Sequence, residues 1–221
     1  KQGIHQGDLT IDNVDTINLL SLEKRSLLKL NKENQFPTFI DDFYLENSYF
    51  LEINYLNKET LYQFMKKEPL SPEKIKSIIL KIISVVKLLH EKYNIIHRDI
   101  SFDNVLIDEH QEISVIDFEF SYDLKQWNPP SIIMGTPGFY NANRLNIDQY
   151  TDVYSIISLL YFMDNFDLYC NYKNDHNKLT LQRNSIDKGT SSFYFIYLQA
   201  QYHSARYSLD MLEHDLRTLS V

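Results

Sequence analysis

The side chains best suited to chemistry gather in one stretch, residues 96–120. Asp99 is followed five residues later by Asn104, and Asp117 comes after a hairpin pattern of two short apolar runs separated by a polar turn. Because a β-hairpin brings its two ends together, we expect these three side chains to meet at one edge of it. Carboxylate and amide oxygens are the ligands that Mg²⁺ prefers. The stretch therefore predicts a magnesium site made by Asn104 and Asp117, with Asp99 placed to orient a hydroxyl nucleophile.

The same residues resemble the catalytic loop and the magnesium loop of protein kinases. Residues 97–104 read H-R-D-I-S-F-D-N, which is similar to the family's H-R-D-L-x-x-x-N, and residues 117–119 read D-F-E where the family has D-F-G. The resemblance implies an α+β, bilobal protein-kinase-like fold. It also implies that Asp99 accepts the proton of the acceptor hydroxyl while Asn104 and Asp117 hold Mg²⁺. A solvated acidic hairpin without chemistry is the alternative.

Residues 1–53 are expected to be a partial small lobe. Residues 18–30 place leucines at helical spacing and predict an amphipathic helix, and Glu23 within it resembles the glutamate of the family's helix C. Lys1 lies 22 residues before Glu23, where the family has its strand lysine, so the resemblance implies an ion pair that steadies the nucleotide's phosphates. A solvated terminal lysine is the alternative. No Gly-rich loop precedes Lys1, so we expect the first small-lobe strands to lie in a longer protein.

The next stretch predicts an adenine pocket. Residues 49–55 alternate, as a β-strand with one buried face does, and resemble the last small-lobe strand running into the hinge. Ile53 then takes the gatekeeper place, and Asn54 and Leu56 present backbone groups to the adenine edge. Leu106, between the candidate catalytic residues, would form the apolar floor beneath the base. Tyr55 and Leu56 could equally be ordinary core residues.

Residues 54–221 would form a mainly helical large lobe. The Ser-Pro pair at 71–72 predicts a helix start, because serine caps a helix and proline fits its first turn, and apolar residues follow at helical spacing. A second helix is predicted over residues 148–163. Residues 164–205 show no clear period and are expected to hold short helices, and a closing amphipathic helix is predicted over 209–219.

Two further segments resemble parts of the kinase large lobe. Residues 135–139, G-T-P-G-F, are similar to a segment in which the Thr136 hydroxyl would brace the catalytic aspartate. Asp152, in D-V-Y-S, would hydrogen-bond the backbone of the catalytic loop. The glutamate of the family's A-P-E motif is replaced by Asn143, so Arg206, which resembles the arginine that pairs with it, lacks its expected partner.

Bulk composition narrows the classes of protein. A chain of 221 residues, 43% of them hydrophobic, can bury a core, whereas a net charge of -8 argues against nucleic acid or an anionic membrane as a partner. Cys170 is the only cysteine, so an internal disulfide is excluded and a cytoplasmic location is expected. No run of about 18 uncharged apolar residues occurs, so no transmembrane helix is predicted.

Two departures from the family pattern point to a subfamily. Ser101 stands where many Ser/Thr kinases have a lysine, and Glu119 replaces the glycine of D-F-G. Together with G-T-P-G-F, they resemble the kinase domains of class III and class IV lanthipeptide synthetases. The resemblance implies Mg²⁺, ATP or GTP as phosphate donor, and a precursor peptide with a leader segment as substrate. It also implies neighbouring lyase and cyclase domains, which convert the phosphorylated residues to dehydroamino acids and add cysteine thiols to them.

Three other functions stay open. A general protein Ser/Thr kinase would share these motifs. A small-molecule kinase of the choline or aminoglycoside type has similar I-D-F-E and H-x-D-x-x-x-x-N motifs, but G-T-P-G-F followed by D-V-Y-S counts against it. A pseudokinase that only binds is favoured by Glu119, by Asn143 and by the missing strands, whereas the filled metal and base positions count against it.

Overall fold

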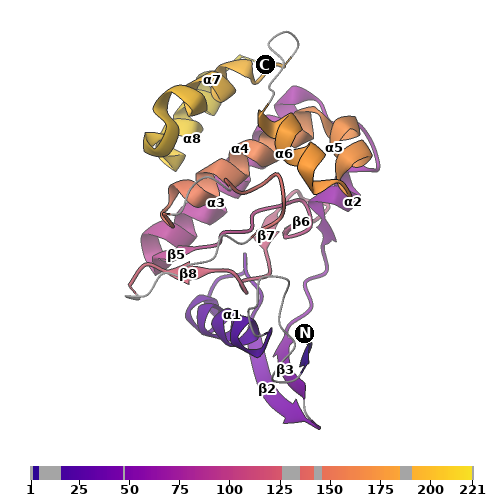
Figure 1. Ribbon diagram of the computed structural model, residues 1–221, viewed down its shortest axis with the longest axis vertical. Helices are drawn as coiled ribbons and strands as arrows, with labels where there is room; N and C mark the ends of the chain where they lie inside the picture. Colours follow the sequence, from indigo (N-terminus) through magenta and orange to yellow (C-terminus); the bar gives the residue numbers. More distant parts are fainter. Residues whose placement is uncertain are drawn as a thin grey trace.

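The computed structural model describes residues 2–4, 16–46, 48–125, 135–141, 146–184 and 191–220. Figure 1 shows a small sheet with helix α1 at one end, a larger group of helices at the other, and short strands between them. In chain order the elements are β1 (Gln2–Ile4), α1 (Thr16–Leu30), β2 (Phe39–Leu45), β3 (Ser48–Ile53), β4 (Glu59–Thr60), α2 (Leu61–Met65), α3 (Pro72–Leu88), a π-helix (Leu89–Tyr93), β5 (Ile95–Ile96), β6 (Val105–Ile107), β7 (Ile113–Val115), β8 (Tyr122–Asp123), α4 (Tyr150–Asp164), α5 (Phe166–Tyr172), α6 (His176–Asn184), α7 (Tyr194–His203), a 3₁₀ helix (Ser204–Arg206) and α8 (Leu209–Thr218).

Helix α1 covers one face of the small sheet. β3 lies between β1 and β2 and pairs antiparallel with both. The alternation of β3 buries Tyr49 and Leu51, and α1 contacts all three strands. Lys24 of α1 also pairs with Asp42 of β2 at 2.5 Å. The helix predicted from the leucine spacing is therefore confirmed, and the sheet fixes its orientation.

β3 is shorter than the sequence predicts. The alternation was expected to continue through residue 55, but pairing with β2 ends at Ile53. Asn54 ties the chain to Thr38 instead: its N–H donates to the Thr38 carbonyl (3.0 Å), and its side-chain oxygen accepts from Thr38 N–H (2.6 Å). Tyr55 is 85% exposed. The alternative that it belongs to the core is therefore wrong.

Helix α3 is the long, deeply buried helix of the larger region. The Ser71 hydroxyl accepts a hydrogen bond from Lys74 N–H (3.3 Å), and Pro72 opens the helix, as predicted. Isoleucines and valines at helical spacing form its buried face. The helix continues as the π-helix, and Asn94 then adopts a left-handed conformation (φ 57°). This end directs the chain through β5 to His97.

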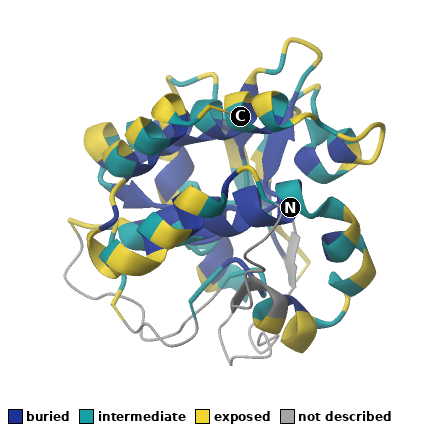
Figure 2. Cartoon of the chain, turned by 90° about the horizontal axis from the view of Figure 1, so that it is seen from above, coloured by how far each residue is buried: buried dark blue, intermediate teal, exposed yellow. Residues whose placement is uncertain are grey.

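Helix α4 packs against α3 and is buried on nearly all sides, as a helix at the centre of a helical region should be. It confirms the helix predicted over residues 148–163. The short helices α5, α6 and α7 and the closing helix α8 also lie where they were expected. Figure 2 shows buried residues on the inward faces of the helices and exposed residues on their outer faces. None of the helices in the described part of the chain has the length and apolar character that crossing a bilayer requires.

A cluster of aromatic rings joins α2 and α5 to the loop before β6. The ring of Phe102, in that loop, packs against Phe166 and Tyr169 of α5, with centroids 5.6 and 4.5 Å away. It also packs against Phe139 at 5.9 Å. Tyr62 of α2 contacts the two α5 rings at 5.9 and 6.1 Å. Such ring pairs stabilise the fold beyond the burial of their apolar area. The cluster therefore holds the loop before β6 in place.

Adjacent leucines of α1 provide a matched test of this packing. Leu27 is fully buried, whereas Leu28 is 49% exposed. We predict that Leu27→Ala lowers the free energy of unfolding by about 2–5 kcal/mol, because it leaves a cavity between α1 and the core. Leu28→Ala should change it by less than about 0.5 kcal/mol. Denaturant unfolding measures both, and equal losses would contradict the observed orientation of α1.

Candidate active site

Asp99, Asn104 and Asp117 share one site at the open end of the β6–β7 hairpin. The Asn104 side-chain amide donates hydrogen bonds to the Asp99 carboxylate (2.7 Å) and to the Asp99 carbonyl (3.0 Å). The backbone N–H of Ile116 donates to the Asn104 carbonyl (3.0 Å), which joins the two ends of the hairpin. Asp117 follows directly, and its negative charge acts on Asp99. The hairpin thus does what the sequence predicts: it brings distant polar side chains to one edge.

Asp99 is almost buried, and Thr136 holds its carboxylate. The Thr136 N–H donates to Asp99 Oδ1 at 2.6 Å, and the Thr136 hydroxyl bonds to the same carboxylate. Burial raises the pKa of Asp99 and the charge of Asp117 adds to this, although the hydrogen bonds from Thr136 oppose the shift. A carboxylate with a raised pKa is a stronger proton acceptor than an ordinary one. Asp99 is therefore suited to act as a base.

Gly135 allows Thr136 to come this close. Its φ is +140°, and a Cβ placed on it would lie 2.8 Å from the carbonyl oxygen of Arg98. Any other residue would clash with the backbone of the catalytic loop. The contact between Thr136 and Asp99 therefore depends on glycine at this position.

His97 joins the loop of Asp99 to the loop of Asp117. The backbone N–H of Asp99 donates to His97 Nδ1 at 3.2 Å. The proton of the ring must then be on Nε2, which lies 3.0 Å from the carbonyl oxygen of Ile116, a group that can only accept. The ring also packs edge-on against Phe118, with centroids 4.8 Å apart. His97 is therefore a structural clamp in its Nε2–H tautomer.

The loop of Asp117 is fastened to helix α1 through Phe118. The Phe118 N–H donates to Oε1 of the fully buried Glu23 at 3.4 Å. The Phe118 carbonyl accepts from the Ser121 hydroxyl (2.6 Å), which in turn accepts from the Ser26 hydroxyl of α1 (2.7 Å). Asp117 itself has a φ of 70°, and such a conformation costs a non-glycine residue about 1–3 kcal/mol. Backbone strain of this kind is typical of functional sites.

The buried carboxylate of Asp152 holds the backbone that carries Asp99. It accepts the N–H groups of His97 (2.8 Å) and Arg98 (2.7 Å), together with His90 Nε2 (2.8 Å). Burial would raise the pKa of Asp152, but hydrogen bonds from His90 and His97 outweigh it and lower the pKa. The predicted role of Asp152 is confirmed. The part played by His90 was missed, because a single histidine near a helix end carries no sequence signal.

The predicted adenine pocket is described in part. Leu106 is buried in β6, and Ile53 is half-buried at the end of β3. The N–H of Asn54 donates to the Thr38 carbonyl. The Leu56 carbonyl accepts from Lys58 N–H (2.8 Å) and is likewise engaged. The expectation that Asn54 and Leu56 present backbone groups to a base stays a prediction.

Three of the predicted residues need separate mention. Lys1, the expected partner of Glu23, lies outside the described residues, and so does Asn143. Arg206, the residue expected to have lost its partner at position 143, is exposed in the 3₁₀ helix. The proposed pairing of Lys1 with Glu23 stays a prediction.

The side-chain oxygens of Asn104 and Asp117 suit Mg²⁺ only when phosphate oxygens complete its coordination. The Asn104 amide nitrogen donates to Asp99, which leaves its side-chain oxygen available as a ligand, and the charge of Asp117 acts on the same Asp99 carboxylate. Within the described ranges, no group of three or more His, Cys, Asp or Glu could hold a metal ion unaided. Mg²⁺ commonly binds one or two protein oxygens and takes the rest from substrate phosphates and water. The residues present therefore fit a nucleotide-bound magnesium ion.

Comparison with known proteins agrees with this geometry. The protein kinase domain family matches residues 12–212. The chain is 32% identical over 103 residues to the phosphorylase b kinase gamma catalytic chain, liver/testis isoform, of Bos taurus, covering 46% of this chain and 25% of that protein. It is 29% identical over 142 residues to the serine/threonine-protein kinase shk2 of Schizosaccharomyces pombe (63% and 24%).

A third relative is the dual specificity mitogen-activated protein kinase kinase 1 of Dictyostelium discoideum, 27% identical over 138 residues (59% and 21%). The chain spans about a quarter of the length of these relatives. The family match covers nearly the whole chain, including every residue of the site from Glu23 to Asp152. The chain belongs to the protein kinase domain family.

Proposed function

We propose that this domain is a Ser/Thr kinase, which transfers the γ-phosphate of ATP or GTP to a serine or threonine hydroxyl of a peptide. The observation that carries the proposal is the environment of Asp99. Its buried carboxylate has a raised pKa, bonds to Asn104 and Thr136, and lies within range of the Asp117 charge. The protein kinases among its relatives support the same reaction.

The chemistry follows from this arrangement. Phosphoryl transfer needs positioning and compensation of negative charge more than covalent catalysis. Asp99 orients the acceptor hydroxyl and takes its proton as the new oxygen–phosphorus bond forms, while the bond from the γ-phosphorus to the bridging oxygen breaks and the nucleoside diphosphate leaves. Asn104 and Asp117 would hold Mg²⁺, which would supply charge compensation at the phosphate oxygens. Glu23, fixed against Phe118, is placed on α1 to hold a phosphate-binding lysine, and Lys1 is our candidate.

Within this function we propose a narrower substrate, a precursor peptide with a leader segment that is modified to a lanthipeptide. The support is the combination of Ser101, Glu119 and the G-T-P-G-F segment. Ser101 is buried in the catalytic loop, at a position where many Ser/Thr kinases have a lysine. On this proposal the domain works in the cytoplasm beside a lyase and a cyclase domain. A general protein Ser/Thr kinase is the function if the narrower proposal fails.

A substrate panel tests the narrower proposal. We expect the full protein to transfer labelled phosphate from ATP or GTP to a leader-bearing precursor peptide at least about tenfold faster than to the same peptide without its leader, because remote binding energy is used at the reacting centre. Casein and choline are the controls. Faster transfer to casein would leave a general protein kinase, and faster transfer to choline would contradict peptide phosphorylation altogether.

The second prediction concerns the metal and the base. Asp99→Asn and Asp117→Asn should each lower kcat by about 10²–10³, because each removes one charged group from the reacting centre. Only Asp117→Asn should also weaken the dependence of nucleotide binding on Mg²⁺, as measured by thermal shift with and without the ion. Glu109→Gln, at the exposed hairpin turn, is the matched control and should keep full activity. Normal turnover by both aspartate variants would contradict the assignment, and a protein that never transfers phosphate would be a binding module.

The third prediction uses the raised pKa of Asp99. Only the ionised carboxylate accepts a proton, so activity is lost as the pH falls through this pKa. The Thr136 hydroxyl lowers the pKa of Asp99, and Thr136→Val should therefore move the acidic limb of the kcat/KM profile to higher pH. Thr136→Ser keeps a hydroxyl and should leave the limb in place. A limb that moves to lower pH in Thr136→Val would show that Asp99 is not the titrating base.

A further inference from the structure

A cavity of about 440 Å³ lies beside the aromatic cluster, with which it shares Phe166. Four segments surround it: the end of α2 with the loop that follows, the start of α3, the end of α4, and α5. Its volume is in the range of small-molecule sites. It is partly open to solvent, so a small ligand can reach its apolar wall directly. Its apolar wall consists of Met65, Leu70, Ile75, Met163 and Phe166.

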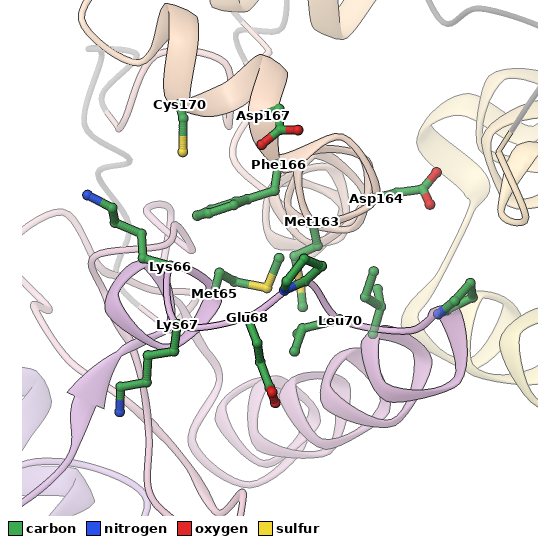
Figure 3. A pocket seen from close by; sticks show the side chains of 13 residues that line it. Met65, Lys66, Lys67, Glu68, Leu70, Met163, Asp164, Phe166, Asp167 and Cys170 are labelled. Atoms are coloured by element: carbon green, nitrogen blue, oxygen red, sulfur yellow. The ribbon is translucent and has the colours of Figure 1, made fainter.

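The charged side chains at the edge of the cavity differ in their partners and in their direction. Lys67 pairs with Glu59 (2.5 Å), and the ammonium group of Lys66 lies 5.4 Å from the ring centre of Tyr62. Figure 3 shows both lysine side chains directed outwards, away from Met65. Asp167 is exposed on α5, and no described cation forms a salt bridge with it. Of the three carboxylates in the lining, Glu68 pairs with Lys74 and Asp164 accepts the Ser191 hydroxyl, which leaves Asp167 as the one for a cationic ligand.

We propose that this cavity binds a small amphiphilic cation, with its apolar part among the methionines and its positive group beside Asp167. Methionine side chains adapt to ligands of different shape, and a carboxylate at the mouth favours an ammonium group over an anion. The net charge of -8 favours the same sign of ligand.

The position of the cavity gives the ligand a route to the catalytic loop. Phe166 forms part of the wall, and its ring packs against that of Phe102, which lies between Asp99 and Asn104. A ligand that shifts Phe166 would act on the segment that carries the base. This regulatory step rests on the proposed kinase function, whereas the binding itself does not.

Cys170 provides the readout, because it lines the cavity and is the only cysteine of the chain. We expect n-octylammonium, below its micelle concentration, to slow alkylation of Cys170 by N-ethylmaleimide in the native protein. Affinity in the series n-butyl, n-hexyl, n-octyl should rise by about fourfold per methylene, as burial of apolar surface requires. Octanoate, of equal length, should bind about fivefold less tightly, the size of effect that one ion pair can give.

Two variants locate the effect. Asp167→Asn should remove the preference for octylammonium over octanoate, and the control Glu109→Gln should retain it. Leu70→Trp should fill the cavity and abolish protection, with circular dichroism to check folding; if it fails to fold, Asp167→Asn decides. Absence of protection, equal protection by octanoate, or affinity independent of chain length would each overturn the proposal. None of these results depends on kinase activity, so the proposed function can fail or stand separately.

Discussion

The site depends first on one buried negative charge. The carboxylate of Asp152 accepts two consecutive backbone N–H groups, those of His97 and Arg98, and a third hydrogen bond from His90. Arg98 has a φ of 72°, a conformation that a non-glycine residue adopts only when its surroundings impose it. The carboxylate supplies that constraint. Asp152 belongs to α4, which is buried on nearly all sides because apolar residues occupy nearly all of its faces.

Around this anchor, the active centre is a junction of segments that each contribute one or two contacts. Helix α1 contacts the site through Glu23, and the segment after Gly135 contacts it through Thr136. Helix α5 supports the site by packing against the ring of Phe102, in the loop before β6. No single element builds the site. A displacement of residues 135–139 would therefore remove the hydrogen bonds of Thr136 from the carboxylate of Asp99.

The sequence predicted those features whose signals are local. Ser71 before a proline predicted the start of α3, and turn residues between apolar runs predicted the hairpin. The D-V-Y-S motif identified Asp152. What it could not predict depends on contacts between residues far apart in the chain. The bonds between Asn54 and Thr38 end β3 early and leave Tyr55 in solvent, against the strand periodicity. Likewise, the aromatic cluster joins residues from four segments whose ring types alone do not reveal which partners they will meet.

The close approach at Gly135 has a consequence for genetics. A methyl group at this position would meet the carbonyl oxygen of Arg98 at 2.8 Å, and its next nearest neighbours would be Tyr140 and Asp99. On the proposed function, an alanine allele would therefore displace the segment of Thr136 from Asp99, whereas Asn104 and Asp117, the proposed metal ligands, are not among the three nearest neighbours of the added methyl group. Such a separation-of-function allele would distinguish what a cell needs from the turnover of this enzyme from what it needs from the protein's presence.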